Sequence, residues 1–263
     1  MDIAIIGHNY SKYTKEMIEK LTSNEIALKY IIIQDSCVEN LAESAYYIDN
    51  ELIDAVLSGS WSIKEKNEQE SIIAICIEKK IPFFIVDDQN SFYVSKILRY
   101  WIVDVLLLTD GPIIRGDILS LPHLCALNLH PAPLPWFRGN WATRLALYHD
   151  YPPLVSAHVV TNEVDGGAII DTMRYNVYEN DTASDIDDRA WQACKSLAVS
   201  VLQDMACNGL RAKKQRKWEG TEYKGYHQEG IFYPAMTESM QRELDKRLQN
   251  NEYGFYSKRE TQK

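Results

Sequence analysis

The sequence lacks the features that would assign it to several special classes of protein. It contains no run of 18 apolar residues, so no transmembrane helix is expected. Its first residues, MDIAIIGHNY, lack the basic region of a secretory signal peptide and are typical of a first β-strand. No internal repeat and no low-complexity segment occurs. We therefore expect a globular protein of the cytoplasm without a membrane partner.

Cysteine is scarce and is not arranged for metal binding or for disulfides. The five cysteines are odd in number and never form a C-x-x-C pair, which argues against a zinc site and a disulfide framework. We expect most of them to be thiols of the core and expect no metal cofactor. The cysteines are Cys37, Cys76, Cys125, Cys194 and Cys207.

Positive charge is also in short supply. The formal net charge of −9 counts against a nucleic-acid partner. One basic run, residues 211–217, is interpreted as a solvated helix end or loop, and contact with an anionic substrate is the alternative.

Short apolar runs rich in β-branched residues alternate with longer helical patterns. The expected strands cover residues 3–6, 28–33, 81–86, 104–108, 125–129, 155–160 and 168–177. The expected helices cover residues 11–21, 38–57, 63–80, 91–101, 140–149, 183–208 and 238–250. Such alternation predicts an α/β fold with a doubly wound, mostly parallel sheet. A helix end at Gly209 predicts a catalytic domain of residues 1–209 and a small C-terminal appendage of residues 210–263.

Three polar residues have side chains suited to acyl transfer to an amine. Asn128 and His130 lie at the end of an expected strand, where ligands bind in parallel sheets, and Asp165 follows later. An amide donates to a developing oxyanion, an imidazole transfers protons, and a carboxylate orients the imidazole. An amine attacks directly, so no nucleophilic serine or cysteine is needed. Each residue also has a simpler interpretation, as a turn residue (Asn128), a surface-loop histidine (His130) or an Asx-turn residue (Asp165).

The segments around these residues are expected to shape the site. Pro131, Pro133 and Pro135 remove amide donors and stiffen the chain into a wall of a cleft. Gly166 and Gly167 are expected to adopt backbone conformations closed to other residues, which lets Asp165 point into the site.

An ordered set of motifs resembles the folate-dependent formyltransferases. Its first part is Asn128-Leu-His130-Pro, followed by Leu-Pro135-x-x-Arg138-Gly139. Its second part runs from His158 through Val164-Asp165-x-Gly167 to Ile169-Ile170. The resemblance is strong over residues 102–178, and the family includes glycinamide ribonucleotide, methionyl-tRNA and nucleotide-sugar N-formyltransferases.

The resemblance implies a one-carbon transferase with a Rossmann-like formyltransferase fold and 10-formyltetrahydrofolate as donor. Asn128, His130 and Asp165 then form the catalytic triad, with Asn128 and a protonated His130 stabilising the oxyanion. His130 and Asp165 are expected to handle the proton that the amine loses and N10 of the folate gains. His158, in contrast, is interpreted as a structural residue of its strand. The expected cofactor-binding residues are Gly111, Pro112, Ile113, Ile114, Ala132, Pro133, Leu134, Pro135, Thr161, Asn162, Glu163 and Val164.

The acceptor amine is left open by the shared motifs. The tRNA enzyme carries a sizeable C-terminal barrel and a basic surface, and we do not expect that enzyme here because about 55 residues follow Gly209 and the net charge is −9. The purine enzyme has a glycine-rich phosphate loop after its first strand, where this chain has residues 7–12 with one glycine. Residues 160–167, however, resemble the purine enzyme, so a phosphoribosylglycinamide formyltransferase stays an alternative.

The nucleotide-sugar enzymes are more similar in having a core with a short appendage and no phosphate loop. We therefore expect a nucleotide-linked amino sugar as the small-molecule acceptor, in the biosynthesis of surface polysaccharides. Aromatic residues of the appendage either stack on the acceptor or pack on the core or on a second copy in a homodimer. A non-catalytic folate-binding protein on the same fold is the remaining alternative. The aromatic residues are Trp218, Tyr223, Tyr226 and Tyr233.

Overall fold

The computed structural model describes residues 1–35, 46–58, 71–215 and 236–257. The chain forms two compact units, Met1–Asn128 and Leu129–Lys263, which are described in turn. The described strands occur in one sheet of order β3-β4-β2-β1-β5-β6-β7-β8. The expected boundary at residue 209 between a catalytic domain and an appendage stays a prediction.

The first unit alternates strands and helices as expected. Strands β1, β2, β4, β5 and the start of β6 pair in parallel, and β3 pairs antiparallel with β4. The elements are β1 (Ile3–His8), α1 (Lys12–Ser23), β2 (Tyr30–Gln34), β3 (Tyr46–Ile48), α2 (Asn50–Leu57), α3 (Ile72–Lys79), β4 (Phe83–Val86), α4 (Phe92–Tyr100), β5 (Val105–Leu108), η1 (Gly116–Ser120) and β6 (Cys125–His130).

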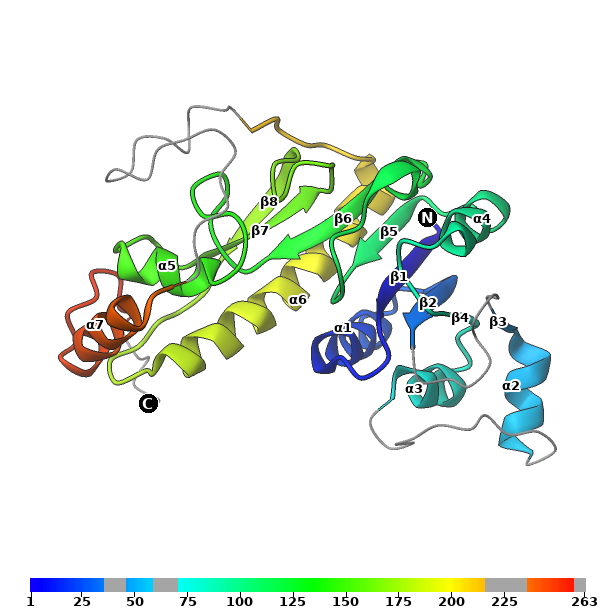
Figure 1. Ribbon diagram of the computed structural model, residues 1–263, viewed down its shortest axis with the longest axis horizontal. Coiled ribbons are helices and arrows are strands. Elements are labelled where there is room, and N and C mark those ends of the chain that lie inside the picture. Colours follow the sequence, from blue (N-terminus) through cyan, green and yellow to red (C-terminus); the bar gives the residue numbers. More distant parts are fainter. Residues whose placement is uncertain (36–45, 59–70, 216–235, 258–263) are drawn as a thin grey trace. The chain divides into compact units, whose positions relative to one another are not determined.

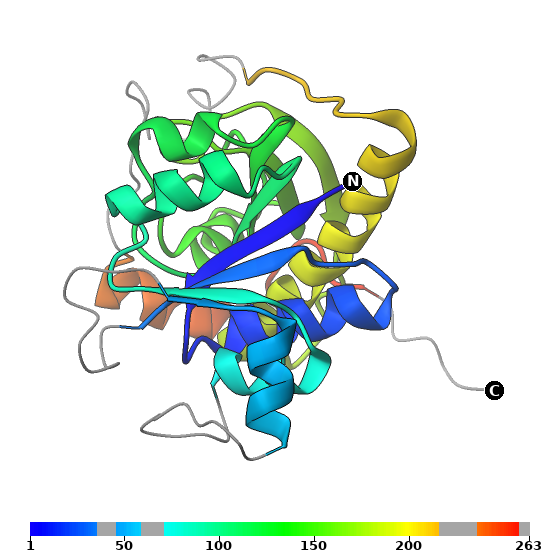
Figure 2. The same cartoon turned by 90° about the vertical axis from the view of Figure 1, so that its right-hand side faces the viewer.

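Helices cover both faces of this part of the sheet, with α4 on one face and α1 and α3 on the other (Figure 2). Ala4 and Ile6 of β1 pack with Val94, Ile97 and other buried residues of the α4 side. Strands buried on both faces read as continuous apolar runs rather than alternating ones, which explains why β1, β2 and β4 could be predicted.

One predicted helix is partly wrong. Of the helix expected over residues 38–57, the structure forms α2 only from Asn50 onward and extends Tyr46–Ile48 as β3. The main-chain pairing of β3 with β4 decides this short edge strand, and no local pattern encodes such pairing. Residues 38–45 of that prediction, and 63–70 of the next helix, lie outside the described residues.

The second unit continues from the end of β6 through α5 (Ala142–Tyr148), β7 (Leu154–Val159), β8 (Ile169–Arg174), α6 (Ala183–Asn208) and α7 (Glu238–Gln249). Strands β7 and β8 pair antiparallel, and the long helix α6 packs along both of them (Figure 1). Thr182 and Asp185 form a capping box at the start of α6, and Gly209 ends it with a φ of 74°. Both ends of this helix match the sequence prediction.

Three of the four described cysteines are buried, as expected of core thiols, and Cys207 is exposed. Cys37 lies outside the described residues. Among the helices of the described part, none is long and apolar enough to span a membrane.

Gly7 allows β1 to approach its neighbours closely. A Cβ atom at this position would lie 2.7 Å from Thr14 Oγ1 and 2.5 Å from Thr109 Oγ1. These two hydroxyls share a hydrogen bond of 2.7 Å, and Thr109 also donates to the carbonyl oxygen of Ile6. A side chain at position 7 would therefore separate α1 from the strand end that follows β5.

We predict that Gly7→Ala lowers the free energy of unfolding by about 2 kcal/mol, the usual cost of overpacking a well-packed site. Urea denaturation followed by circular dichroism measures this change. Gly254→Ala is the matched control, because the nearest atom to its new methyl group is 3.8 Å away. Equal stability of the two variants would contradict this account of Gly7.

Candidate active site

Strand β6 carries His130 into a buried position at its carboxyl end. The imidazole is 4% exposed, which excludes its interpretation as a surface-loop histidine. Its Nε2 lies 2.7 Å from the carbonyl oxygen of Phe137. A carbonyl oxygen only accepts hydrogen bonds, so Nε2 carries a proton and Nδ1 is the unprotonated nitrogen of the neutral ring.

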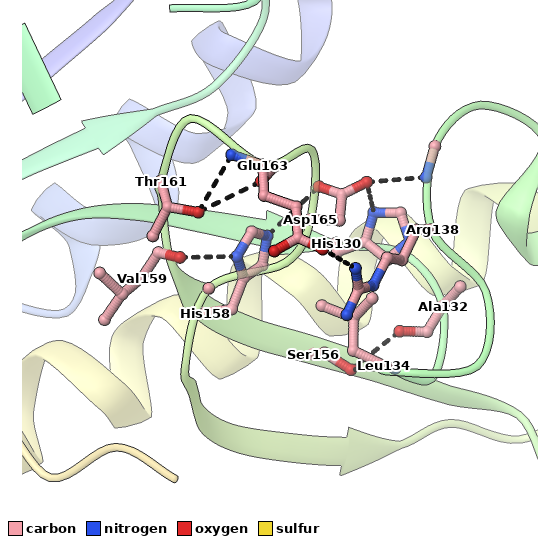
Figure 3. Close-up of polar contacts among 12 residues, drawn as sticks. His130, Ala132, Leu134, Arg138, Ser156, His158, Val159, Thr161, Glu163 and Asp165 are labelled. Atoms are coloured by element: carbon pink, nitrogen blue, oxygen red, sulfur yellow. Dashed lines mark hydrogen bonds and ion pairs between the residues drawn. The ribbon is translucent and has the colours of Figure 1, made fainter. Parts of the chain in front are cut away.

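The Asp165 carboxylate lies between two imidazoles (Figure 3). Its Oδ2 is 3.5 Å from Nδ1 of His130, and its Oδ1 is 3.4 Å from Nε2 of His158. The backbone N–H of Gly139 donates to Oδ2 at 2.8 Å. The structure thus brings together His130 and Asp165, as expected, and adds His158 to them.

Burial and charge set the protonation of this group. Burial lowers the pKa of His130, and although Asp165 opposes this effect, the pKa stays below its ordinary value. Burial tends to raise the pKa of Asp165, but the neighbouring His130 and His158 and the Gly139 amide lower it overall. At neutral pH these directions favour a neutral His130 beside an ionised Asp165 in the free protein, and the expected protonated His130 at the oxyanion stage stays a prediction.

The loop that carries Asp165 differs from expectation in one respect. Asp165 itself has the left-handed conformation, with a φ of 49°, whereas Gly166 and Gly167 do not have positive φ values. Gly167 is needed for space instead, because a Cβ atom there would overlap the carbonyl oxygen of Val159. The prediction that these glycines adopt conformations closed to other residues is therefore wrong.

The proline-rich loop after His130 is fixed by Ser156 of β7. The Ser156 hydroxyl accepts from the Leu134 N–H at 3.0 Å and donates to the Ala132 carbonyl at 2.9 Å (Figure 3). Ala132, Pro133 and Leu134 are buried, and Pro135 is half-buried with a cis peptide bond before it. This loop is therefore held firmly beside His130.

The loop that precedes Asp165 presents exposed groups. Thr161, Asn162 and Glu163 are exposed, and Val164 is half-buried. The Thr161 hydroxyl contacts both the N–H and the carbonyl of Glu163 at 3.3 Å, which closes a tight turn. Polar and backbone groups of this turn are accessible to a ligand.

Residues Gly111, Pro112 and Ile113 of the first unit are also exposed, and Ile114 is buried. Two side chains from the loop after β4 fix the position of this segment by hydrogen bonds. Gln89 donates to the carbonyl of Asp110 at 3.2 Å, and Asn90 donates to the carbonyl of Ile113 at 3.1 Å. The loop thus offers backbone groups and the apolar side chain of Ile113 on a fixed frame.

Asn128 lies two residues before His130 on β6, opposite Leu108 of β5. Alternation along the strand directs the two side chains to the same face. Their position at the end of a parallel strand agrees with the expectation from the sequence.

Two residues of this site were missed by sequence reasoning. His158, interpreted as a structural residue, contacts Asp165 directly. The sequence did offer one indication of this role, because Ser156 and His158 are two polar residues at alternate positions of an otherwise apolar strand. Gln215 contacts the carbonyl oxygens of Asp165 and Gly167, and the basic run around it gave no hint of this.

Within the described residues no cluster of three or more His, Cys, Asp or Glu is arranged to hold a metal ion. The aromatic residues expected to stack on an acceptor, Trp218, Tyr223, Tyr226 and Tyr233, lie outside the described residues.

Comparison with known proteins identifies relatives of this arrangement. The methionyl-tRNA formyltransferase of Thermotoga maritima is 24% identical over 144 residues, which is 54% of this chain and 46% of that protein. The chain thus spans about half the length of the curated relatives it matches.

Two solved structures share the fold. An N-formyltransferase from Helicobacter canadensis, solved with folinic acid and dTDP-3-aminofucose, has 16% identity and a TM-score of 0.55 over 98% of this chain and 84% of its own. A phosphoribosylglycinamide formyltransferase from Anaplasma phagocytophilum has 18% identity and a TM-score of 0.56 over 82% of this chain and 94% of its own.

A family model described as formyl transferase matches residues 49–202, which is more than half of the sequence and includes Asn128, His130 and Asp165. The chain belongs to the formyl transferase family.

Proposed function

We propose that this protein is a folate-dependent N-formyltransferase. It transfers the formyl group of 10-formyltetrahydrofolate to the amine of a nucleotide-linked amino sugar. The observation that carries this proposal is the buried His130 imidazole, whose unprotonated Nδ1 faces the Asp165 carboxylate at 3.5 Å. A base held in one tautomer beside a fixed anion suits proton removal from an attacking amine.

In this reaction the amine nitrogen of the acceptor attacks the formyl carbon and forms the new C–N bond. His130 Nδ1 takes the proton that the amine loses, and the ionised Asp165 stabilises the resulting imidazolium. The bond between the formyl carbon and N10 then breaks, and N10 takes a proton from His130. The products are the formamide and tetrahydrofolate.

Asn128 supplies the other contribution that this chemistry needs. The carbonyl oxygen of the formyl group gains negative charge when the amine attacks, and a side-chain N–H on the same face as His130 stabilises that charge. We assign this role to Asn128. His130 enters the reaction neutral and becomes a cation only after it has taken the proton.

We assign donor binding to the three exposed or firmly held segments described above. A pterin ring needs hydrogen-bonding groups at its edge and apolar contact on its face, and these segments contain both. Gly111, Pro112, Ile113 and Ile114 offer backbone groups and an Ile113 side chain that is 46% exposed. Ala132 to Pro135 and Thr161 to Val164 offer further backbone groups around His130 and Asp165.

The residues at the carboxyl end of β1 are not arranged to bind a phosphate group of the acceptor, which favours a nucleotide-linked amino sugar over the purine substrate. Asn9 is buried, and its Nδ2 donates to Asp35 at 2.7 Å. The first N–H groups of α3, those of Ile72 and Ile73, donate to the backbone and side-chain oxygens of Asn9. These two N–H groups are thus already used, and the buried Asp35 carboxylate nearby would repel a phosphate.

The start of α1 also supports an acceptor that is not held there by a phosphate. Ser11 accepts from the N–H of Thr14 at 3.1 Å at the start of α1. In addition, the sugar N-formyltransferase matches 98% of this chain and the purine enzyme 82%, which agrees with a core plus appendage. We place the reaction in the cytoplasm, in the biosynthesis of surface polysaccharides, without a nucleic-acid or membrane partner.

The first prediction concerns the substrate. Tetrahydrofolate release from 10-formyltetrahydrofolate should occur with nucleotide-linked amino sugars and not with glycinamide ribonucleotide or simple amines. Absorbance follows the release, and mass spectrometry identifies the formamide. Release only with glycinamide ribonucleotide would replace the proposed acceptor, and tight folate binding without release to any amine would refute the enzyme.

The second prediction concerns the catalytic residues. Asn128→Ala and His130→Ala should each lower kcat by about 100-fold, the usual scale for losing an oxyanion donor or a general base. His123→Ala is the matched control because its exposed imidazole contacts only Asp104 among the ion pairs of the described residues. Near wild-type kcat in both triad variants would contradict the assigned roles.

The third prediction concerns protonation. Because burial lowers the pKa of His130, its ring resonances should titrate with a midpoint below 6.5. Asp165 raises that pKa, so Asp165→Asn should move the midpoint further down. Nuclear magnetic resonance measures both, and the spectrum of His130→Ala assigns the signal. A midpoint above 6.5, or one that rises in Asp165→Asn, would contradict the neutral starting state.

A further inference from the structure

The chain returns to the edge of the sheet after α6. Lys213 and Ile169 exchange two backbone hydrogen bonds, of 2.7 and 2.8 Å, in an antiparallel bridge beside β8. Residues 211–214 are exposed, but the next residue, Gln215, is only 8% exposed. The bridge therefore delivers one polar side chain from an exposed segment into the interior.

Both the nitrogen and the oxygen of the Gln215 side-chain amide form hydrogen bonds in the interior. Its Nε2 donates to the carbonyl oxygens of Asp165 at 2.8 Å and Gly167 at 2.7 Å. Its Oε1 accepts from Nη2 of Arg138 at 2.7 Å. Both N–H donors of the amide are thus used, and its carbonyl oxygen accepts one bond.

The backbone that receives these bonds has a conformation that needs support. Asp165 has a φ of 49°, which is uncommon for a residue other than glycine. The two carbonyls that Gln215 binds belong to Asp165 and to Gly167, so they fix the chain at and just beyond the catalytic carboxylate. Without a donor, these carbonyls would lose their bonds in a site with little access to water.

Arg138 extends the same network to the other side of the carboxylate. Its Nη1 donates to Glu163 at 2.7 Å, while Gln215 holds its Nη2. The next residue, Gly139, donates its N–H to Asp165 Oδ2. Gln215 thus joins the loop that carries the carboxylate, residues 163–167, to the loop that donates to it, residues 138–139.

We propose that Gln215 is a positioning residue that fixes the Asp165 carboxylate opposite His130 by joining these two loops. The expected effect of Gln215 on turnover rests on the proposed function. Its expected effect on the conformation of the Asp165 loop does not. Gln215 acts through Asp165 and does not itself contact the reacting atoms. The residue lies in the segment that follows the matched family region, residues 49–202.

Two variants test this role. Gln215→Met keeps the shape of the side chain and removes both donors and the acceptor. Gln215→Glu keeps the acceptor for Arg138 but, when ionised, cannot donate to the two carbonyls. Gln241→Met is the matched control, since Gln241 also accepts from an arginine, Arg144 at 2.9 Å, and donates to Asp245 at 2.8 Å.

Hydrogen exchange measures the loop without any substrate. Amides of residues 161–168 should exchange about 10-fold faster in both Gln215 variants, as expected when buried carbonyls lose their donors. The Gln241 variant should exchange like the wild type in this segment. Equal protection of the loop in all four proteins would overturn the proposal.

Turnover then measures the consequence. With the acceptor that the wild type uses, kcat should fall about 10-fold in both Gln215 variants, while KM for the donor changes less than about threefold. Wild-type kcat in Gln215→Met, or an equal loss in Gln241→Met, would overturn the positioning role. If the wild type formylates no amine but the loop still loosens in both variants, the proposed function fails and the structural role of Gln215 stands.

Discussion

The site depends on one buried anion, the carboxylate of Asp165. A charge removed from water is stable only when other groups replace its solvation, and here the Gly139 N–H donates to the carboxylate while the rings of His130 and His158 lie within 3.5 Å of it. This requirement explains why β7 carries a histidine toward the loop and why the chain at Gly139 turns its amide inward. The proton chemistry proposed for His130 follows from the same charge, because an imidazolium beside it is favoured once the proton has moved.

The fold provides the rigidity that this arrangement needs. Parallel strands with apolar residues on both faces bring the end of β6 to the position where ligands bind in such sheets. Ser156 holds the loop after His130, and Phe137 fixes the tautomer of the imidazole. In the same unit, Asn9 accepts from two N–H groups at the start of α3, and Ser11 accepts from one N–H group at the start of α1.

The fold, and the proximity of His130 to Asp165, could be predicted from the sequence for physical reasons. Buried strands and the cap residues of α6 leave local patterns, and the spacing of Asn128, His130 and Asp165 is distinctive. Interactions between distant segments leave no such pattern. The edge strand β3 depends on pairing with β4, and Gln215 binds backbone carbonyls, which every residue has. Likewise, Gly167 is required by the position of Val159 rather than by its own backbone angles.

The bridge between Ile169 and Lys213 has a consequence for how the protein is made. During synthesis Asn128, His130 and Asp165 leave the ribosome well before residue 215, with the whole of α6 between them. A nascent chain that ends within α6 therefore contains these three residues but not the Gln215 amide, which contacts the carbonyl oxygens of Asp165 and Gly167. The hydrogen bonds between Gln215 and the loop of Asp165 form only after the segment beyond Gly209 has been added and has paired with Ile169 of β8.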